Sequence, residues 1–320
     1  MRQSKHRALR EAGPVQPAVV VSRGRNRAWV AVEEDGTLLL CDFPSLDVLP
    51  AVGDSVLIRP AQGAPGEGII VELLPRTRAI TRTTAAGERK TMAANVDLLV
   101  IVAALARPAL RYGFIDRALA FAEHQEIAPL VALTKADLAA TETLTQALAL
   151  YRNRLRYDTL VLSTVDHRGI AELGEQIAGR RALMLGQSGV GKSSLFRALG
   201  ADRGARVGEV NERTGRGRQT TTSSRLAYLG HGFLIDTPGV REFSLADLDA
   251  GELAGCFRDL APYVGRCRFP DCRHQEEPAC AVKAAVEAGE ILAVRYASYR
   301  RALEQATRSL LSDVVARLRI

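Results

Sequence analysis

The chain has 320 residues, 47% of them hydrophobic and 25% charged, a composition typical of a folded protein with two or three domains. Its formal net charge of +7 favours an anionic partner such as a nucleic acid. The apolar run at residues 98–106 is too short to cross a bilayer, and no apolar stretch follows the basic N-terminus. Because three of the five cysteines cluster with a histidine, a reducing compartment is favoured over a disulfide framework. We therefore expect a cytoplasmic protein without a membrane partner.

The N-terminal part predicts a small β-barrel behind a basic tail. Residues 1–14 form the tail, and residues 15–80 contain short β-rich runs separated by turn residues. The runs are 18–22, 28–32, 37–41, 55–58 and 68–74. Five short strands suit a small barrel, either an OB-fold, the five-stranded barrel that binds oligonucleotides, or an SH3-like barrel, which has the same pattern.

In residues 81–244, strand-like and helix-like runs alternate. The strand-like runs are 98–103, 130–133, 159–162, 182–185 and 233–235, and the helix-like runs include 115–124, 143–155 and 170–177. This alternation predicts an α/β domain with a doubly wound parallel sheet covered by helices on both faces. Residues 245–320 are expected to be helical and to end in a long helix, because Leu303, Leu310, Val314 and Leu318 recur at helical spacing.

Residues 186–193 match the phosphate-binding pattern G-x-x-x-x-G-K-[ST] at every position, after a strand and before a helix. Glycines allow the backbone N–H groups to approach phosphates closely. We expect Lys192 to reach the outer phosphates and the Ser193 hydroxyl to bind Mg²⁺. A glycine-rich turn without a ligand is the alternative. The expected nucleotide contacts are Gly186, Gln187, Ser188, Gly189, Val190, Gly191, Lys192, Ser193 and Ser194.

A second motif, Asp236-Thr237-Pro238-Gly239, follows the strand-like run 233–235. A carboxylate at a strand end is placed to hold the hydration shell of Mg²⁺, and the Gly239 N–H is placed to bond the γ-phosphate. Alone, this tetrapeptide is more typical of a turn. Its position after a phosphate loop favours the catalytic interpretation.

A third motif, Thr134-Lys135-Ala136-Asp137, follows the run 130–133 and is expected to recognise the base. The Asp137 carboxylate can accept two hydrogen bonds from guanine, whereas adenine would leave this charge unpaired. Ser163, at the end of the next strand, is expected to support the base from the other side. A strand-to-helix turn capped by Asp137 is the alternative. Together, the motifs predict a site for GTP rather than ATP.

Three cysteines and one histidine lie within fourteen residues: Cys267, Cys272, His274 and Cys280. Three thiolates and one imidazole saturate a tetrahedral Zn²⁺, which leaves no open position for catalysis. We therefore predict one structural zinc per chain, with chance clustering of buried thiols as the alternative. Cys41 and Cys256 stand apart and are expected to be packing residues.

The base-recognition loop precedes the phosphate loop in this chain, and the Thr220-Thr221-Thr222 run and the 236–239 motif follow. This order resembles that of circularly permuted GTPases. Together with residues 93–97, 215–222 and 236–243, it resembles the RsgA (YjeQ/YloQ) family, the GTPases of small ribosomal subunit assembly. The resemblance implies an N-terminal OB-fold, a permuted P-loop GTPase core and a C-terminal zinc domain.

Two positions depart from the family pattern. Thr134 stands where the family usually has asparagine, whose side chain mainly ties loops together, so guanine specificity through Asp137 should survive. Gln219 stands where the family usually has histidine. Because Val240 cannot orient water, we expect Gln219 to position the attacking water and Thr221 to ligate Mg²⁺ in the GTP state.

The sequence thus predicts a GTP hydrolase that acts on the small ribosomal subunit and its rRNA late in assembly, as a monomer. Hydrolysis is expected to be stimulated by the subunit and coupled to release. The alternative is a GTP-gated RNA-binding scaffold with negligible hydrolysis. The 236–239 motif runs directly into the predicted zinc-binding residues 245–320, and the barrel leads into the part of the GTPase domain that contains the base-recognition motif. We therefore expect the bound nucleotide to be coupled to partner binding.

Overall fold

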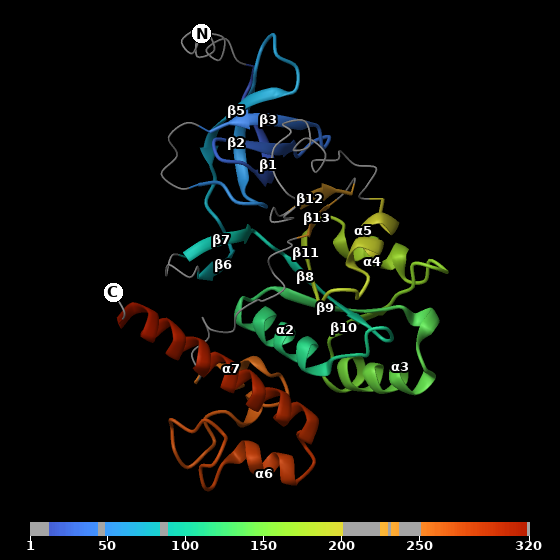
Figure 1. Cartoon of the computed structure of the whole chain (residues 1–320), viewed down its shortest axis with the longest axis vertical. Coiled ribbons are helices and arrows are strands. Elements are labelled where there is room, and N and C mark those ends of the chain that lie inside the picture. The colour runs from blue at the N-terminus through green and yellow to red at the C-terminus, as the bar shows by residue number, and fades with distance from the viewer. Residues whose placement is uncertain are drawn as a thin grey trace.

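The computed structural model describes residues 13–43, 49–83, 89–200, 225–229, 232–236 and 251–318. Figure 1 shows a β-barrel at one end, a sheet flanked by helices in the middle and a mainly helical region at the other end. Most of the predicted basic tail lies outside the described residues. The predicted boundaries at residues 14, 80 and 244 stay a prediction.

The N-terminal barrel is closed and has the strand order β1-β2-β3-β5-β4. Its strands are β1 (Gln16–Arg23), β2 (Arg27–Val32), β3 (Leu38–Asp42), β4 (Ser55–Pro60) and β5 (Glu67–Leu73). β3 and β5 are parallel, and the other neighbouring strands are antiparallel. Alternate apolar residues such as Val20, Val30 and Ile58 fill the interior. The prediction of an OB-like barrel is confirmed.

A two-stranded antiparallel hairpin connects the barrel to the central sheet. It consists of β6 (Ala79–Thr83) and β7 (Arg89–Ala94), and the sequence analysis did not predict it. Its residues are mainly alanine, threonine and basic residues, so they lack the apolar alternation that identifies a half-buried strand.

The central sheet has the order β10-β9-β8-β11-β13-β12. Its strands are β8 (Leu98–Ala104), β9 (Ala128–Thr134), β10 (Asp158–Val161), β11 (Arg181–Gly186), β12 (Arg225–Tyr228) and β13 (Phe233–Asp236). All neighbouring pairs are parallel except β12 and β13, which are antiparallel. The predicted parallel sheet is therefore confirmed, with an antiparallel edge strand that the sequence analysis missed.

Helices cover both faces of this sheet, and consecutive residues of β8 face opposite sides. Leu99 and Ile101 lie in one core cluster with α2, whereas Val100 and Val102 lie in another with α4. The helices are α2 (Tyr112–His124), α3 (Thr141–Leu148), a π-helical continuation at Ala149–Arg154, α4 (Ile170–Ile177) and α5 (Lys192–Ala198). A strand buried on both faces has a continuous apolar sequence, which explains why β8 was predicted correctly.

The described C-terminal residues, 251–318, form 3₁₀ turns at Leu253–Cys256 and Ala261–Tyr263 and the helices α6 (Ala281–Glu287) and α7 (Ala293–Leu318). In Figure 1, α7 lies alongside α2. Leu303 from the predicted apolar stripe is buried in the same core cluster as Leu119 of α2. Within the described residues, no helix is long and apolar enough to span a membrane.

Buried charged residues join the C-terminal residues 251–318, here called the zinc region, to the sheet domain. Arg295 of α7 pairs with Asp116 of α2 at 2.5 Å and with Asp259 at 2.9 Å, and Arg295 and Asp116 are each 1% exposed. The Tyr151 hydroxyl donates to the same Asp116 carboxylate at 3.0 Å. Burial raises the pKa of Asp116, while the charge of Arg295 opposes that shift. Arg154 adds two hydrogen bonds to the carbonyls that follow α6.

The polar contacts between the barrel and the sheet domain include a more exposed ion pair. Arg181, the first residue of β11, donates to Glu33 at 3.1 Å and to Ser55 at 2.8 Å. Asn95 accepts from the Thr77 N–H at 2.9 Å and donates to the Gly53 carbonyl at 3.3 Å. Residues 93–97 therefore act structurally, because they connect the barrel, the hairpin and β8.

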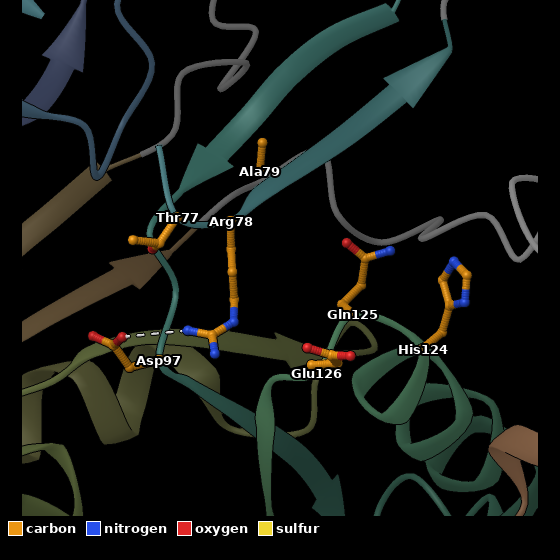
Figure 2. Close-up of a pocket in the computed structure, with 7 residues that line it drawn as sticks. All are labelled: Thr77, Arg78, Ala79, Asp97, His124, Gln125 and Glu126. Carbon is orange, nitrogen blue, oxygen red and sulfur yellow. Dashed lines mark ion pairs between the residues drawn. The ribbon is translucent and has the colours of Figure 1, made fainter. Parts of the chain in front are cut away.

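A cleft of about 550 Å³ lies beside this connection, between the start of β6, the start of β8 and the end of α2. Figure 2 shows that Arg78 and Asp97 pair across one side, with His124 and Glu126 on the other. Asp97 precedes β8, so the cleft lies at the amino end of that strand.

Candidate nucleotide site and zinc centre

Two of the predicted nucleotide motifs and the first residue of the third lie at the carboxyl ends of parallel strands in one sheet. The phosphate loop begins at Gly186, where β11 ends, and the base-recognition loop begins at Thr134, where β9 ends. Ser163 follows β10, and Asp236 ends β13. In open parallel sheets, ligands bind in the crevice outside this edge. The sheet therefore gathers segments that are far apart in sequence.

The phosphate loop has the backbone that close contact with phosphate requires. Gly189 and Gly191 have φ values of 77° and 103°, which side chains disfavour. A Cβ on Gly186 would lie 2.6 Å from the Val102 carbonyl oxygen. The Lys192 ammonium donates to the Gly186 carbonyl at 2.5 Å and to the Gln187 carbonyl at 2.8 Å. The lysine is thus folded over its own loop, where an anion would sit.

Thr134 links the two loops directly. Its hydroxyl lies 2.6 Å from the Val190 carbonyl in the phosphate loop and 3.3 Å from the Ala103 carbonyl, and the residue is 3% exposed. This is the tie between loops that the sequence analysis assigned to the family's asparagine. Lys135 has a left-handed backbone, and its ammonium contacts the Arg107 carbonyl.

Ser163 orients the carboxylate expected to recognise the base. Its hydroxyl donates to Asp137 at 2.9 Å and accepts from the Val165 N–H at 3.2 Å. Ser163 is 1% exposed, whereas Asp137 is exposed. Asp137 is therefore held from the protein side with its remaining acceptor capacity directed outward. The sequence analysis placed Ser163 against the base and missed this bond, because residues 137 and 163 are brought together only by the pairing of β9 with β10.

Of the catalytic residues predicted in the threonine run and the 236–239 motif, the structure describes only Asp236. The backbone of Asp236 pairs with Met184, two residues before the phosphate loop. Gln219, Thr221 and Gly239 lie outside the described residues. Their roles stay predictions.

The four predicted zinc ligands form a compact cluster, and their ligand atoms all lie within 4.8 Å of one another. The Nδ1 of His274 is 3.4 Å from the sulfurs of Cys267 and Cys280 and 3.5 Å from that of Cys272. The Cys267 and Cys280 sulfurs are 3.8 Å apart. A tetrahedral Zn²⁺ with ordinary bond lengths requires edges of about 3.6 Å between nitrogen and sulfur and about 3.8 Å between sulfurs. The cluster fits a zinc site.

Hydrogen bonds around the cluster fix its ligands. The Ala281 N–H donates to the Cys267 sulfur at 3.3 Å. The Tyr296 hydroxyl donates to the His274 carbonyl at 2.6 Å, and the Tyr299 hydroxyl donates to the Arg273 carbonyl at 2.8 Å. Such outer contacts orient metal ligands. Both tyrosines belong to α7, so the zinc site and the joint to α2 share one helix.

A phosphate loop tied to a base-recognition loop that precedes it in the chain defines a circularly permuted GTPase. The model of the RsgA GTPase family matches residues 73–246. The chain is 43% identical to a small ribosomal subunit biogenesis GTPase RsgA from Azotobacter vinelandii, covering 92% of this chain and 86% of the relative. The relative of the same name from Pectobacterium atrosepticum is 37% identical, covering 93% and 86%. The chain belongs to the RsgA GTPase family.

Solved structures agree with this assignment. The crystal structure of YjeQ from Thermotoga maritima matches with a TM-score of 0.73 and 30% identity, covering 92% of this chain and 99% of that one. YloQ, described as a circularly permuted GTPase, matches with a TM-score of 0.71 and 25% identity, covering 93% and 97%. The family and fold predicted from the sequence are confirmed.

Proposed function

We propose that this GTPase hydrolyses GTP on the small ribosomal subunit during late assembly, with hydrolysis stimulated by the subunit and coupled to release. The observation that carries the proposal is the bond between Thr134 and Val190, which holds the base-recognition loop against the phosphate loop. The relatives named as small ribosomal subunit biogenesis GTPases support the choice of partner. A scaffold with negligible hydrolysis is not favoured, because the family consists of GTPases.

Each nucleotide contact has a proposed role. Asp137, held by Ser163, accepts hydrogen bonds from guanine. Lys192 neutralises the outer phosphates. The Ser193 hydroxyl and the Asp236 carboxylate are oxygen donors of the kind that Mg²⁺ prefers, so we assign the ion to them. When bound with GTP, the ion supplies neutralisation of charge on the phosphates. Gln219 is proposed to orient the attacking water.

The partner side of the proposal rests on charge and architecture. The net charge of +7 suits rRNA, and an OB-like barrel is a fold that binds oligonucleotides. We further propose that the protein acts as a monomer in the cytoplasm.

The decisive experiment measures GTP turnover of the purified chain with and without purified small subunits. We expect strong stimulation, which is absent when large subunits replace small ones. A variant with both Lys192→Ala and Ser193→Ala is the control and should show no turnover. Equal turnover with and without small subunits would reject the proposal.

Base recognition has its own test. Asp137→Asn should weaken GTP binding and admit xanthosine triphosphate, whose base offers a carbonyl acceptor where guanine has an amine. Unchanged GTP affinity in this variant would exclude Asp137 as the recognising residue.

A further inference from the structure

The barrel touches the edge of the nucleotide-binding sheet at a glycine. Gly36 has a φ of +72°, and a Cβ built on it would lie 2.3 Å from Cδ1 of Tyr228. The Tyr228 ring therefore lies directly on the Gly36 backbone. Asp35 fixes this turn by accepting hydrogen bonds from the Thr37 N–H at 2.8 Å and the Thr37 hydroxyl at 2.6 Å. Only a residue without a side chain fits beneath the ring.

Apolar packing extends this contact along β1 and β12. Val19 and Val21 alternate with the barrel-filling Val20 and so lie on the outer surface of the barrel. They belong to the same core cluster as Leu226 of β12 and Ile235 of β13. In Figure 1, β12 lies next to β1. The outer surface of the barrel is thus continuous with the edge of the sheet.

The contacted strand leads to the nucleotide site. Within the described part of the sheet, β12 is an edge strand that pairs only with β13. Tyr228 at the end of β12 pairs with Phe233 at the start of β13, and their ring centroids are 5.4 Å apart. The other end of β13 is Asp236, opposite Met184 of β11. The paired backbone of the hairpin therefore connects the barrel contact at Tyr228 to Asp236.

We propose that the contact between Tyr228 and Gly36 positions the β12–β13 hairpin, and that it transmits RNA binding at the barrel to GTP hydrolysis. The inference deepens the proposed function and rests on it. Tyr228 is a positioning residue that acts through the backbone of β13. Without the contact, the barrel still binds RNA and the loops still bind GTP, but the two events are uncoupled.

The chain provides a matched control for the glycine. Gly63 has a φ of +81° and also lies in a barrel loop, but a Cβ built on it meets nothing within 4 Å. Gly36→Ala and Gly63→Ala thus impose similar backbone strain, and only Gly36→Ala displaces the Tyr228 ring. Tyr228→Ala removes the contact without changing the barrel sequence, and Tyr228→Phe retains the ring.

The experiment measures intrinsic turnover, turnover on saturating small subunits, GTP affinity and cosedimentation with subunits. Gly36→Ala and Tyr228→Ala should lose stimulation on the order of ten- to hundredfold, the usual size of an energetic coupling between two sites. Their intrinsic turnover, GTP affinity and cosedimentation should match the parent protein. Gly63→Ala and Tyr228→Phe should match the parent in all four measurements.

Parental stimulation in Tyr228→Ala would overturn the inference, and so would an equal loss of intrinsic turnover, because the residue would then support the fold alone. If Gly36→Ala does not fold, Tyr228→Ala decides the question. If the proposed function itself is wrong, the unmodified protein will show no stimulation by small subunits, so the two failures can be distinguished.

Discussion

The zinc region and the barrel are attached to the GTPase domain in different ways. The zinc region is held by Arg295 and Asp116, each 1% exposed, together with Asp259 and Tyr151. The barrel is held by Arg181 and Glu33, whose side chains are 18% and 39% exposed, by the apolar packing of β1 on β12, and by the Tyr228 ring on Gly36. Breaking a buried ion pair is far more costly than breaking an exposed one. The buried charges around Arg295, here called the zinc joint, are therefore costly to break, whereas the ion pair of the barrel joint, between Arg181 and Glu33, is not.

The zinc region and the barrel each contact a different part of the GTPase domain from the part that they adjoin in sequence. In sequence, the zinc region follows the 236–239 motif and the barrel precedes the base-recognition half. In space, the zinc region packs on α2, the helix that lies between β8 and β9 in sequence. The barrel packs on β12. The expected coupling through the 236–239 motif stays a prediction, because residues 237–250 are outside the described residues. The contact between Gly36 and Tyr228 is a second route, which is the one proposed above.

Loss of zinc should have the largest effect and should affect one region only. Cys272→Ala, or chelation, should unfold the region around α6, because zinc contributes on the order of 10 kcal/mol to folding in small zinc domains. GTP affinity should change little, since the nucleotide loops are outside this region. Zinc content by elemental analysis and circular dichroism provide the measurement. Cys256→Ala removes a buried thiol outside the cluster and should keep one zinc per chain.

Arg295→Ala should be the next most severe change. It leaves Asp116 and Asp259 buried without their cation, which costs about 3–5 kcal/mol of unfolding free energy. Chemical denaturation measures the loss. Arg300→Ala, on the exposed side of the same helix, is the control and should cost little. A loss for Arg295→Ala no larger than that of the control would show that the zinc joint is not held by charge.

Arg181→Ala tests the barrel joint in the same assay. We expect a loss of at most about 1 kcal/mol, because exposed ion pairs contribute little to stability. The difference from the parent should shrink further in high salt, which screens Arg181 from Glu33. If this variant is destabilised as strongly as Arg295→Ala, the two joints are alike and the contrast fails.

Thr134→Val should affect the nucleotide site alone and should leave both joints intact. It keeps the shape of the side chain but removes the hydroxyl between Val190 and Ala103, at a cost of about 1 kcal/mol. GTP should bind roughly fivefold more weakly by this estimate. Thr134→Ser keeps the hydroxyl and should bind GTP as the parent does. Parental affinity in Thr134→Val, measured by calorimetry, would show that the tie between the loops is dispensable.

Much of the fold was predictable because several strands are buried on both faces and are therefore continuously apolar, as in β8 and β11. The β6–β7 hairpin and β12 were missed for the opposite reason. Their short sequences are too polar or too brief to show a period. The zinc ligands and the phosphate loop were predictable because the ligands lie within fourteen consecutive residues and the loop within eight, so neither pattern depends on distant contacts.

The sequence alone determined the GTPase motifs, their permuted order, the zinc ligands and the family, because these depend on residue types at short spacing. Only the tertiary structure decided that Ser163 holds Asp137, that Thr134 ties the loops, and that Arg295 pairs with Asp116. Each of these pairs joins residues that are far apart in the chain, and strand order and helix packing bring them together. The same reason explains why the barrel contacts β12 through Gly36, a residue whose sequence context indicated only a turn.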